Sequence, residues 1–320
     1  MTGENSKSIR PLLAMAMLLA GCANRMIKPS ETWIGLNSEQ RQKRLQLAPA
    51  YDSRILRYNH GQFEFVERSP RIRKTAAGAA PEVPIVYVHG LGGNMGDFGP
   101  LLLAEDTERT VVAVNLPGTG RSTSQNNEFT INAQADALHE LLIRRMDFRK
   151  VDLVCHSLGG QVCMAFGLEH PANVSSLTLI DAAGSYDQGE FAQRMAKRFG
   201  KVNLGSISVA SHPAISILTG GDQSLVNRLV SDDPTVIAAL DSFNQTYRNH
   251  IRNLTVPVLL IWGENDPIFP IQNGFFLLSN IRDIRMKVAP DAGHLPQLTN
   301  PDLVGGWIRA FHQSLATTHP

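Results

Sequence analysis

The sequence predicts an α/β fold in which a mostly parallel sheet is flanked by helices. Runs that are apolar at nearly every position indicate short strands buried on both faces, and they cover residues 85–88, 151–154, 177–180 and 257–263. Segments with helical periodicity follow two of these runs. The 320 residues, 43% of them apolar, suit one such domain with an insertion better than two independent domains.

Two further strand signals lie outside the central runs. Residues 54–67, broken at the turn Asn59-His60-Gly61, read as two strands and are expected to start the sheet. Residues 284–288 alternate between apolar and polar side chains, which indicates a strand with one exposed face.

Residues 184–250 form an insertion with amphipathic helical patterns, as in the four-residue repeat of Phe191, Met195 and Phe199. Apolar stripes of this kind usually pack into a core. The functional alternative is a helical cap whose apolar underside forms an acyl pocket, and both readings can hold. The expected organisation is a first segment at 1–21, an anchor, linker and first strands at 22–82, a core at 83–183 and 251–320, and a cap at 184–250.

Ser157 is the candidate nucleophile. It lies in Cys155-His156-Ser157-Leu158-Gly159, between a predicted strand and a helical segment. A serine on a sharp strand-to-helix turn points its hydroxyl out of the sheet, and small neighbours permit the strained backbone. The usual pattern is Gly-x-Ser-x-Gly; here Cys155 replaces the first glycine, and cysteine is small enough to keep the turn. The alternative is a purely structural turn, which the flanking strand and helix disfavour.

A serine hydroxyl needs a base, and the base needs an acid to orient it. His294 and Asp266 each lie just past a predicted strand, downstream of Ser157. His294 would take the Ser157 proton and return it to the leaving group, while Asp266 would hold the imidazole tautomer and stabilise its cation. Glu264, in the same turn, and Asp181, after another strand, compete for the role of the acid. We expect Asp266 to fill it.

The transition state also needs donors for its oxyanion. The strand at 85–88 is followed by the loop His89-Gly90-Leu91-Gly92-Gly93. The backbone amides of Leu91 and Leu158 are the expected donors, and losing one such donor costs about 2.7–4 kcal/mol of transition-state stabilisation. A phosphate cradle is rejected for this loop because no Gly-Lys-Ser/Thr ending follows it.

Together these motifs resemble the α/β-hydrolase superfamily and, within it, the serine esterase and lipase branch with a helical cap. The resemblance implies the α/β-hydrolase fold and a Ser157–Asp266–His294 triad. Besides Cys155, one departure is Asn115, which stands where relatives usually carry aspartate and which should alter only structural hydrogen bonds. The matching motifs are residues 89–92, residues 116–122, the turn around Ser157, residues 262–266, and Gly293-His294.

The N-terminus resembles a bacterial lipoprotein signal peptide. Lys7 and Arg10 precede an apolar run at 11–20 that is too short to span a bilayer, and Leu19-Ala20-Gly21-Cys22 resembles the lipobox. The resemblance implies cleavage before Cys22 and lipidation of its thiol, so that acyl chains worth about 0.8 kcal/mol per buried methylene anchor the protein to a membrane. Ala23, in place of aspartate, implies the periplasmic face of the outer membrane. The alternative is an ordinary secretory peptide with an incidental cysteine.

Charge and cysteine spacing bear on other classes of function. The net charge of +1 and the lack of a basic stripe with interleaved aromatics give no reason to expect nucleic acid as a partner. No Cys/His spacing suggests zinc, and we expect no cofactor. Cys155 and Cys163 are eight residues apart on a strand and a helix, and we expect two buried free thiols, because a disulfide would require the helix to fold back on the strand end.

Three functions are compatible with these features. The first is a serine carboxylester hydrolase, an esterase or lipase, that acts on hydrophobic or lipid-derived esters through an acyl-Ser157 intermediate. The second keeps the triad and changes the reaction to carbon–carbon bond hydrolysis, perhydrolysis or acyl transfer. The third is a non-catalytic binding protein on the same scaffold, which the complete set of triad residues disfavours.

Overall fold

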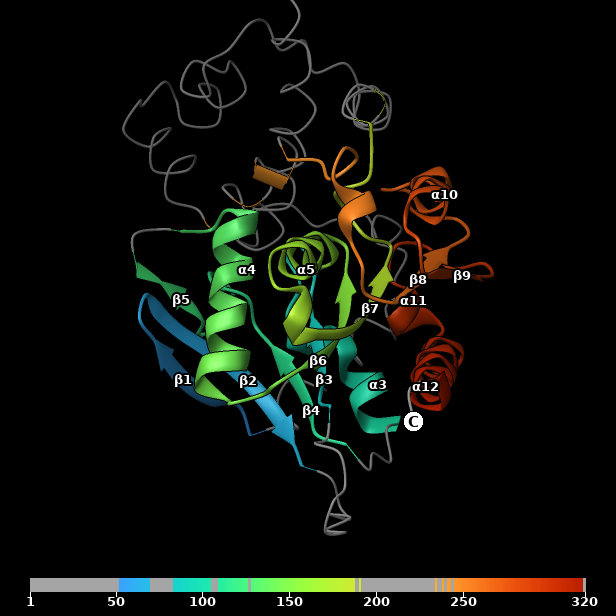
Figure 1. Ribbon diagram of the computed structural model, residues 1–320. Coiled ribbons are helices and arrows are strands. Elements are labelled where there is room, and N and C mark those ends of the chain that lie inside the picture. Colours follow the sequence, from blue (N-terminus) through green and yellow to red (C-terminus); the bar gives the residue numbers. More distant parts are fainter. Residues whose placement is uncertain are drawn as a thin grey trace, which may run out of the picture.

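The computed structural model describes residues 52–69, 83–104, 109–125, 128–187 and 245–318, and residues 190, 234, 238, 241 and 242 between the last two ranges. The described strands form a nine-stranded sheet in the order β1-β2-β4-β3-β6-β7-β8-β9, with β5 paired to β2 (Figure 1). The pairs made by β2 are antiparallel, and all pairs from β4 to β9 are parallel. The strands are β1 (Arg54–Tyr58), β2 (Gly61–Arg68), β3 (Ile85–Val88), β4 (Val111–Val114), β5 (Thr123–Ser124), β6 (Val151–His156), β7 (Val174–Ile180), β8 (Val258–Gly263) and β9 (Ile284–Ala289).

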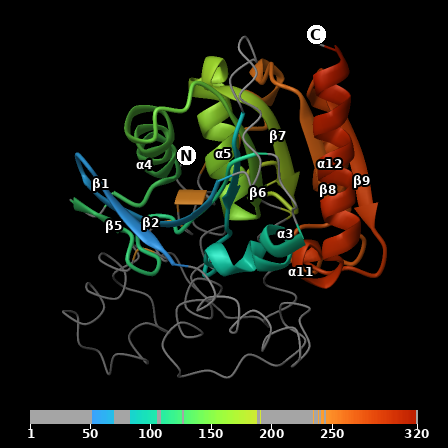
Figure 2. The same cartoon turned by 90° about the horizontal axis from the view of Figure 1, so that it is seen from below.

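Helices cover both faces of the sheet (Figure 2). Side chains of α4, α5 and α10 belong to the apolar cluster on one face, and those of α3 and α12 belong to the cluster on the other. The helices are α3 (Gly99–Ala104), α4 (Ile131–His139), α5 (Leu158–Glu169), α10 (Ile271–Asn280), α11 (Pro296–Thr299) and α12 (Pro301–Thr318), with a π-helical continuation of α4 (Glu140–Arg145) and short 3₁₀ turns η2 (Met95–Phe98), η5 (Pro171–Asn173) and η7 (Ile251–Asn253).

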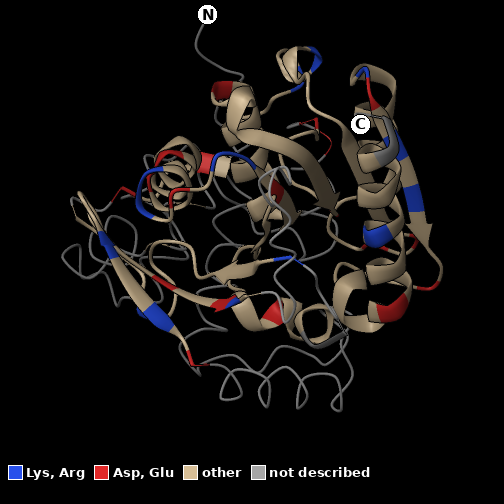
Figure 3. Ribbon diagram, turned by 60° about the horizontal axis from the view of Figure 1, so that its bottom comes forward, with Lys and Arg blue, Asp and Glu red and all other residues tan. Residues whose placement is uncertain are grey.

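The two apolar layers explain why the central strands are apolar at consecutive positions. In β3, Val86 and Val88 pack in one cluster, while Ile85 and Tyr87 pack in the other, as expected when successive side chains point to opposite faces of a sheet. Charged residues lie mostly on the helices, loops and outer strands (Figure 3). β9, at the edge of the sheet, keeps exposed positions among its six residues, which accounts for its alternating pattern.

All the predicted strands are present in the structure, and the turn between β1 and β2 falls at Asn59 and His60. β4 is an additional strand, absent from the prediction, that lies between β2 and β3 in the sheet. Residues 1–21, Cys22 and most of the expected cap, including Phe191, lie outside the described residues. Within the described ranges, the helices are too short or too polar to cross a membrane.

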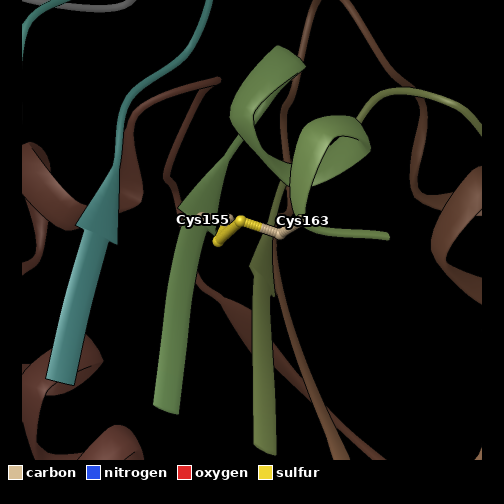
Figure 4. The surroundings of a disulfide bond; sticks show 2 residues. All are labelled: Cys155 and Cys163. Carbon is tan, nitrogen blue, oxygen red and sulfur yellow. A yellow bond between two sulfur atoms is a disulfide. The ribbon is translucent and has the colours of Figure 1, made fainter. Parts of the chain in front are cut away.

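Cys155 and Cys163 form a disulfide (Figure 4), so the prediction of two free thiols is wrong. Their Cα atoms lie 6.5 Å apart, because the turn at Ser157 reverses the chain and the first turns of α5 pack back along the end of β6. The helix therefore does fold back on the strand end, as a disulfide between these positions requires. Both cysteines are fully buried, so the bond lies in the core directly behind the turn.

Candidate active site

Ser157 lies on the turn between β6 and α5 and has φ 53° and ψ −119°. A positive φ is costly for a residue with a side chain and is tolerated where the surrounding structure enforces it. Here the enforcement comes from close packing of α5 on β3: a Cβ atom at Gly159 would lie 2.4 Å from the carbonyl oxygen of His89 and 2.6 Å from that of Val88. Glycine at position 159 therefore lets the helix approach closely enough to form the turn.

The structure brings Ser157, His294 and Asp266 together. The Nε2 atom of His294 is 2.9 Å from the Oγ atom of Ser157, and its Nδ1 atom is 2.8 Å from Oδ2 of Asp266. Because an ionised carboxylate can only accept, Nδ1 carries the hydrogen and Nε2 is left to accept the Ser157 proton. The three predicted side chains come from three separate strand ends, and they form one continuous hydrogen-bonded chain.

Asp266 is held rigidly in this arrangement. Its Oδ1 atom accepts hydrogen bonds from the backbone amides of Ile268, at 2.7 Å, and Phe269, at 3.1 Å. Its side chain has no exposed surface, and that of His294 is 11% exposed. Oδ2 is thus directed at the imidazole, in a place that water does not reach.

The two competing carboxylates have other partners. Glu264 is exposed, and its Oε2 atom accepts the amide hydrogen of Asp291 at 3.1 Å, so it braces the loop that carries His294. Asp181 is fully buried, and its Oδ1 atom accepts the amide hydrogen of Gly263 at 2.8 Å. The side chain in hydrogen-bond contact with the imidazole is that of Asp266.

His156 is a site residue that sequence reasoning missed. Its Nε2 atom donates to the backbone carbonyl of His294 at 2.7 Å, and so it fixes the loop that presents the imidazole. The ring of Phe269 meets the His294 ring edge-on at 5.5 Å, and Tyr186 stacks on Phe269 at 5.5 Å. The position of His156, next to the nucleophile at the end of a strand, is the signal that could have identified it.

The loop after β3 lies directly against the nucleophile. A Cβ atom at Gly90 would lie 2.8 Å from both the Cβ of Ser157 and the Nδ1 of His156. Leu91 and Leu158 both line a small cavity of about 20 Å³ beside this loop. Since Leu158 is the first residue of α5, its amide is one of the N–H groups that a helix leaves without an internal partner. The two predicted oxyanion donors therefore come from neighbouring elements.

Asn115 braces the same loop from the end of β4. Its Oδ1 atom accepts from the amide of Met95 at 2.8 Å, and its Nδ2 atom donates to Glu64 at 2.8 Å. Burial would raise the pKa of Glu64, but hydrogen bonds from the backbone and side chain of Arg121, from Ser53 and from Asn115 lower it to about 2. An amide is suited to this position because it can donate to an ionised Glu64, whereas an aspartate would repel it.

Two groups of described side chains have the spacing of metal ligands. One consists of Asp181, Asp266 and His294, whose nearest ligand atoms lie within 4.8 Å of one another, but its members include two residues of the Ser157 hydrogen-bonded chain. The other consists of Asp136, Glu169 and His170, of which both carboxylates are exposed. Because hydrogen bonds join Asp266 and His294 of the first group to Ser157, we assign this group to the serine site rather than to a metal site.

Comparisons with known proteins agree with this geometry. Residues 85–305 match a model described as the alpha/beta hydrolase family. A pimeloyl-[acyl-carrier protein] methyl ester esterase of Neisseria meningitidis is 28% identical over 259 residues, covering 76% of this chain and 98% of that protein.

Two solved structures share the fold over most of both chains. A membrane phospholipase A, described as a bacterial virulence factor, has a TM-score of 0.64 and 18% identity, covering 95% of this chain and 98% of the other. A thermophilic esterase from Thermogutta terrifontis has a TM-score of 0.61 and 21% identity, covering 82% and 99%. These likenesses and the observed sheet confirm the predicted fold.

Proposed function

Because the chain belongs to the alpha/beta hydrolase family, we propose that it is a serine carboxylester hydrolase, an esterase or lipase, that works through an acyl-Ser157 intermediate. The observation that carries the proposal is the hydrogen-bonded chain from Ser157 Oγ through His294 to Asp266, with contacts of 2.9 and 2.8 Å. All three side chains lie within hydrogen-bond reach of their partners, as catalysis by a positioned base requires.

The reaction has two steps. In the first, the Oγ atom of Ser157 attacks the ester carbonyl carbon while its proton passes to Nε2 of His294. The carbonyl oxygen becomes an oxyanion that the amides of Leu91 and Leu158 bind. The tetrahedral intermediate then collapses, the bond to the alcohol oxygen breaks, and His294 gives that oxygen its proton.

In the second step, water hydrolyses the acyl-Ser157 ester. His294 removes a proton from the water, whose oxygen attacks the acyl carbon. Collapse of the second intermediate returns the proton to Ser157 and releases the carboxylic acid. In both steps Asp266 stabilises the imidazolium while remaining ionised. Its three N–H partners and its lack of exposed surface keep it in that role.

Hydrophobic or lipid-derived esters are the substrate class that we propose. The rings of Phe269 and Tyr186 pack beside His294, and the small cavity next to the loop after β3 is lined by Leu91, Leu116 and Leu158 among others. Apolar walls with a few polar groups suit an acyl chain. The likeness to a membrane phospholipase A and to a methyl ester esterase supports this class. The insertion at 184–250 would cover this side of the site as a cap, with residues 83–183 and 251–320 as the core.

We also propose that the protein is exported and anchored in the cell envelope through a lipid on Cys22, at the periplasmic face of the outer membrane, after removal of residues 1–21. The disulfide between Cys155 and Cys163 supports export, because disulfides persist in oxidising compartments and are rare in the cytosol. Incorporation of labelled palmitate into the wild-type chain, with loss of label and of membrane association in Cys22→Ser, is the expected result. Equal labelling of both chains would contradict the proposal.

The test of the catalytic proposal is hydrolysis of p-nitrophenyl esters, from acetyl to palmitoyl, by the purified full-length chain. Ser157→Ala should lose about 10⁴–10⁶ of the rate and keep its thermal unfolding curve. A variant that retains a tenth of the rate would exclude Ser157 as the nucleophile. A folded wild-type chain that reacts with a fluorophosphonate but hydrolyses none of the esters would favour the carbon–carbon hydrolase, perhydrolase or acyltransferase alternative. A chain that does neither would favour a binding protein.

A further inference from the structure

Asp181 is a fully buried carboxyl group directly behind the triad. It follows β7, has φ 44°, and has no exposed surface. Its ligand atom, that of Asp266 and that of His294 lie within 4.8 Å of one another. The mechanism proposed above uses Asp266 and His294 but leaves Asp181 without a role.

The hydrogen bonds of the two carboxyl groups are unequal. Asp266 accepts three N–H groups, from Ile268, Phe269 and His294. Asp181 accepts one, from Gly263, and its Oδ2 atom receives no donor from the described residues although it is completely buried. A buried carboxylate needs several donors to remain ionised, and only Asp266 has them.

Two ionised carboxylates cannot share so small a buried space without a large repulsion. Burial raises the pKa of Asp181 well above its ordinary value, and the negative charge of the neighbouring Asp266 raises it further. The amide of Gly263 opposes this shift but does not cancel it. Among the described residues, Asp266 and His294 are the titratable groups that lie against Asp181.

We propose that Asp181 is a neutral carboxylic acid whose O–H group donates a hydrogen bond to the Asp266 carboxylate. This inference rests on the proposed serine hydrolase function. Asp181 is then a positioning residue: it acts through Asp266, adds a fourth donor to that carboxylate, and leaves His294 facing a single negative charge. The location of Asp181 also explains why the sequence offers both Asp181 and Asp266 as candidates for the acid of the triad, since both follow parallel strands that end at the same edge of the sheet.

Asp181→Asn is the informative variant because an asparagine amide reproduces both hydrogen bonds of the proposed acid. Its Oδ1 atom can accept from Gly263, and its Nδ2 group can donate to Asp266. Asp181→Ala removes both. Asp291→Asn is the matched control, because Asp291 is an exposed residue with φ 57° on the His294 loop, where the same substitution replaces a carboxylate that lies in solvent.

The first measurement is the rate at which a fluorophosphonate labels the full-length chain as a function of pH. In this reaction the Ser157 Oγ–P bond forms, fluoride leaves, and His294 takes the proton, so the rate falls on the acid side as His294 becomes protonated. Asp181→Asn should stay within about threefold of wild type, and its acid-side midpoint should move by less than about 0.3 pH units. Asp181→Ala should be slower by roughly tenfold or more, with the Asn variant restoring the rate.

An ionised Asp181 would give a different result. Its replacement by a neutral amide would then remove a negative charge from beside His294, and the acid-side midpoint would move to lower pH by about one unit or more. That shift would overturn the proposal. An Asp181→Asn chain that does not fold would overturn it too, because the amide should make every hydrogen bond of the acid.

A second measurement does not depend on catalysis. The infrared difference spectrum of wild type minus Asp181→Asn should contain the C=O stretching band of a protonated carboxylic acid, and the spectrum of wild type minus Asp291→Asn at neutral pH should not. Absence of the band would refute the protonated state even in an active enzyme. Conversely, a wild-type chain that shows the band but does not react with the fluorophosphonate would refute the proposed function while leaving the protonated carboxyl in place.

Discussion

Removal of the disulfide should destabilise the protein by a predictable amount. The bond joins residues separated by eight positions, and a loop this short corresponds to about 2.5 kcal/mol of lost chain entropy in the unfolded state. The double variant Cys155→Ala, Cys163→Ala should therefore lower the free energy of unfolding by at least about this amount, since it also removes two fully buried sulfur atoms. Denaturant unfolding of the full-length chain measures the difference.

Two controls isolate the bond from the packing of the sulfurs. Wild-type protein unfolded in the presence of a reductant should lose the entropic part of the stability, and the double variant should not respond to the reductant. Cys22→Ser should unfold as wild type does and should keep the response. If the non-reduced, denatured Cys22→Ser chain from the cell envelope reacts with a maleimide at Cys155 and Cys163, the bond is absent and the reasoning fails.

The remaining predictions concern the triad and its supports. Asp266→Asn should reduce the hydrolysis rate about 10⁴-fold by favouring the wrong imidazole tautomer; a larger loss in Asp181→Asn would show that the acid is misassigned. Gly159→Ala should prevent folding or strongly lower the unfolding temperature, because the new Cβ would lie 2.4 Å from the carbonyl oxygen of His89, in the loop after β3; a wild-type melting curve would contradict that packing. Asn115→Asp should destabilise the fold by placing a second negative charge against Glu64, and Glu64→Gln should relieve the loss. Because the pKa of Glu64 is lowered to about 2, its contribution to stability should be complete above about pH 4.5 and disappear as the pH falls towards 2, so the stability difference between wild type and Glu64→Gln should shrink over that range.

The fold could be predicted because the central strands are buried on both faces. β6 and β8 are buried at every position, and that burial accounts for their mostly apolar sequences, which in β6 are interrupted by the buried Asp152. β4 is also apolar and buried throughout, but its four residues lie in a stretch without a clear turn signal before them. Strand order and pairing depend on contacts between distant segments, and a single sequence does not contain that information.

The serine and the histidine of the triad could be identified from the sequence, but the choice of its acid was ambiguous. Ser157 and His294 each lie in a distinctive local pattern, whereas Asp181 and Asp266 both follow parallel strands that are neighbours in the sheet. Only the side chain of Asp266 makes a hydrogen bond to the His294 imidazole, and its orientation depends on the backbone of residues 266–269. The amides of Ile268 and Phe269 turn Asp266 towards the imidazole, a detail of loop geometry that spacing does not encode.

The disulfide between Cys155 and Cys163 could not be predicted from spacing, because it depends on the reversal of the chain at Ser157. It also bears on the proposed location of the protein. Cys155 occupies the first position of the pentapeptide around Ser157, where the usual pattern has glycine. The reversal of the chain at Ser157 brings Cys155 within bonding distance of Cys163. Such a bond forms in an oxidising compartment. Export is therefore supported by two independent features, the apolar segment before Cys22 and a cysteine pair more than a hundred residues away. If the chain remained in the cytosol, reduced thiols would be expected at both positions, so the thiol state of the chain as isolated from cells tests the export signal and the fold of the turn together.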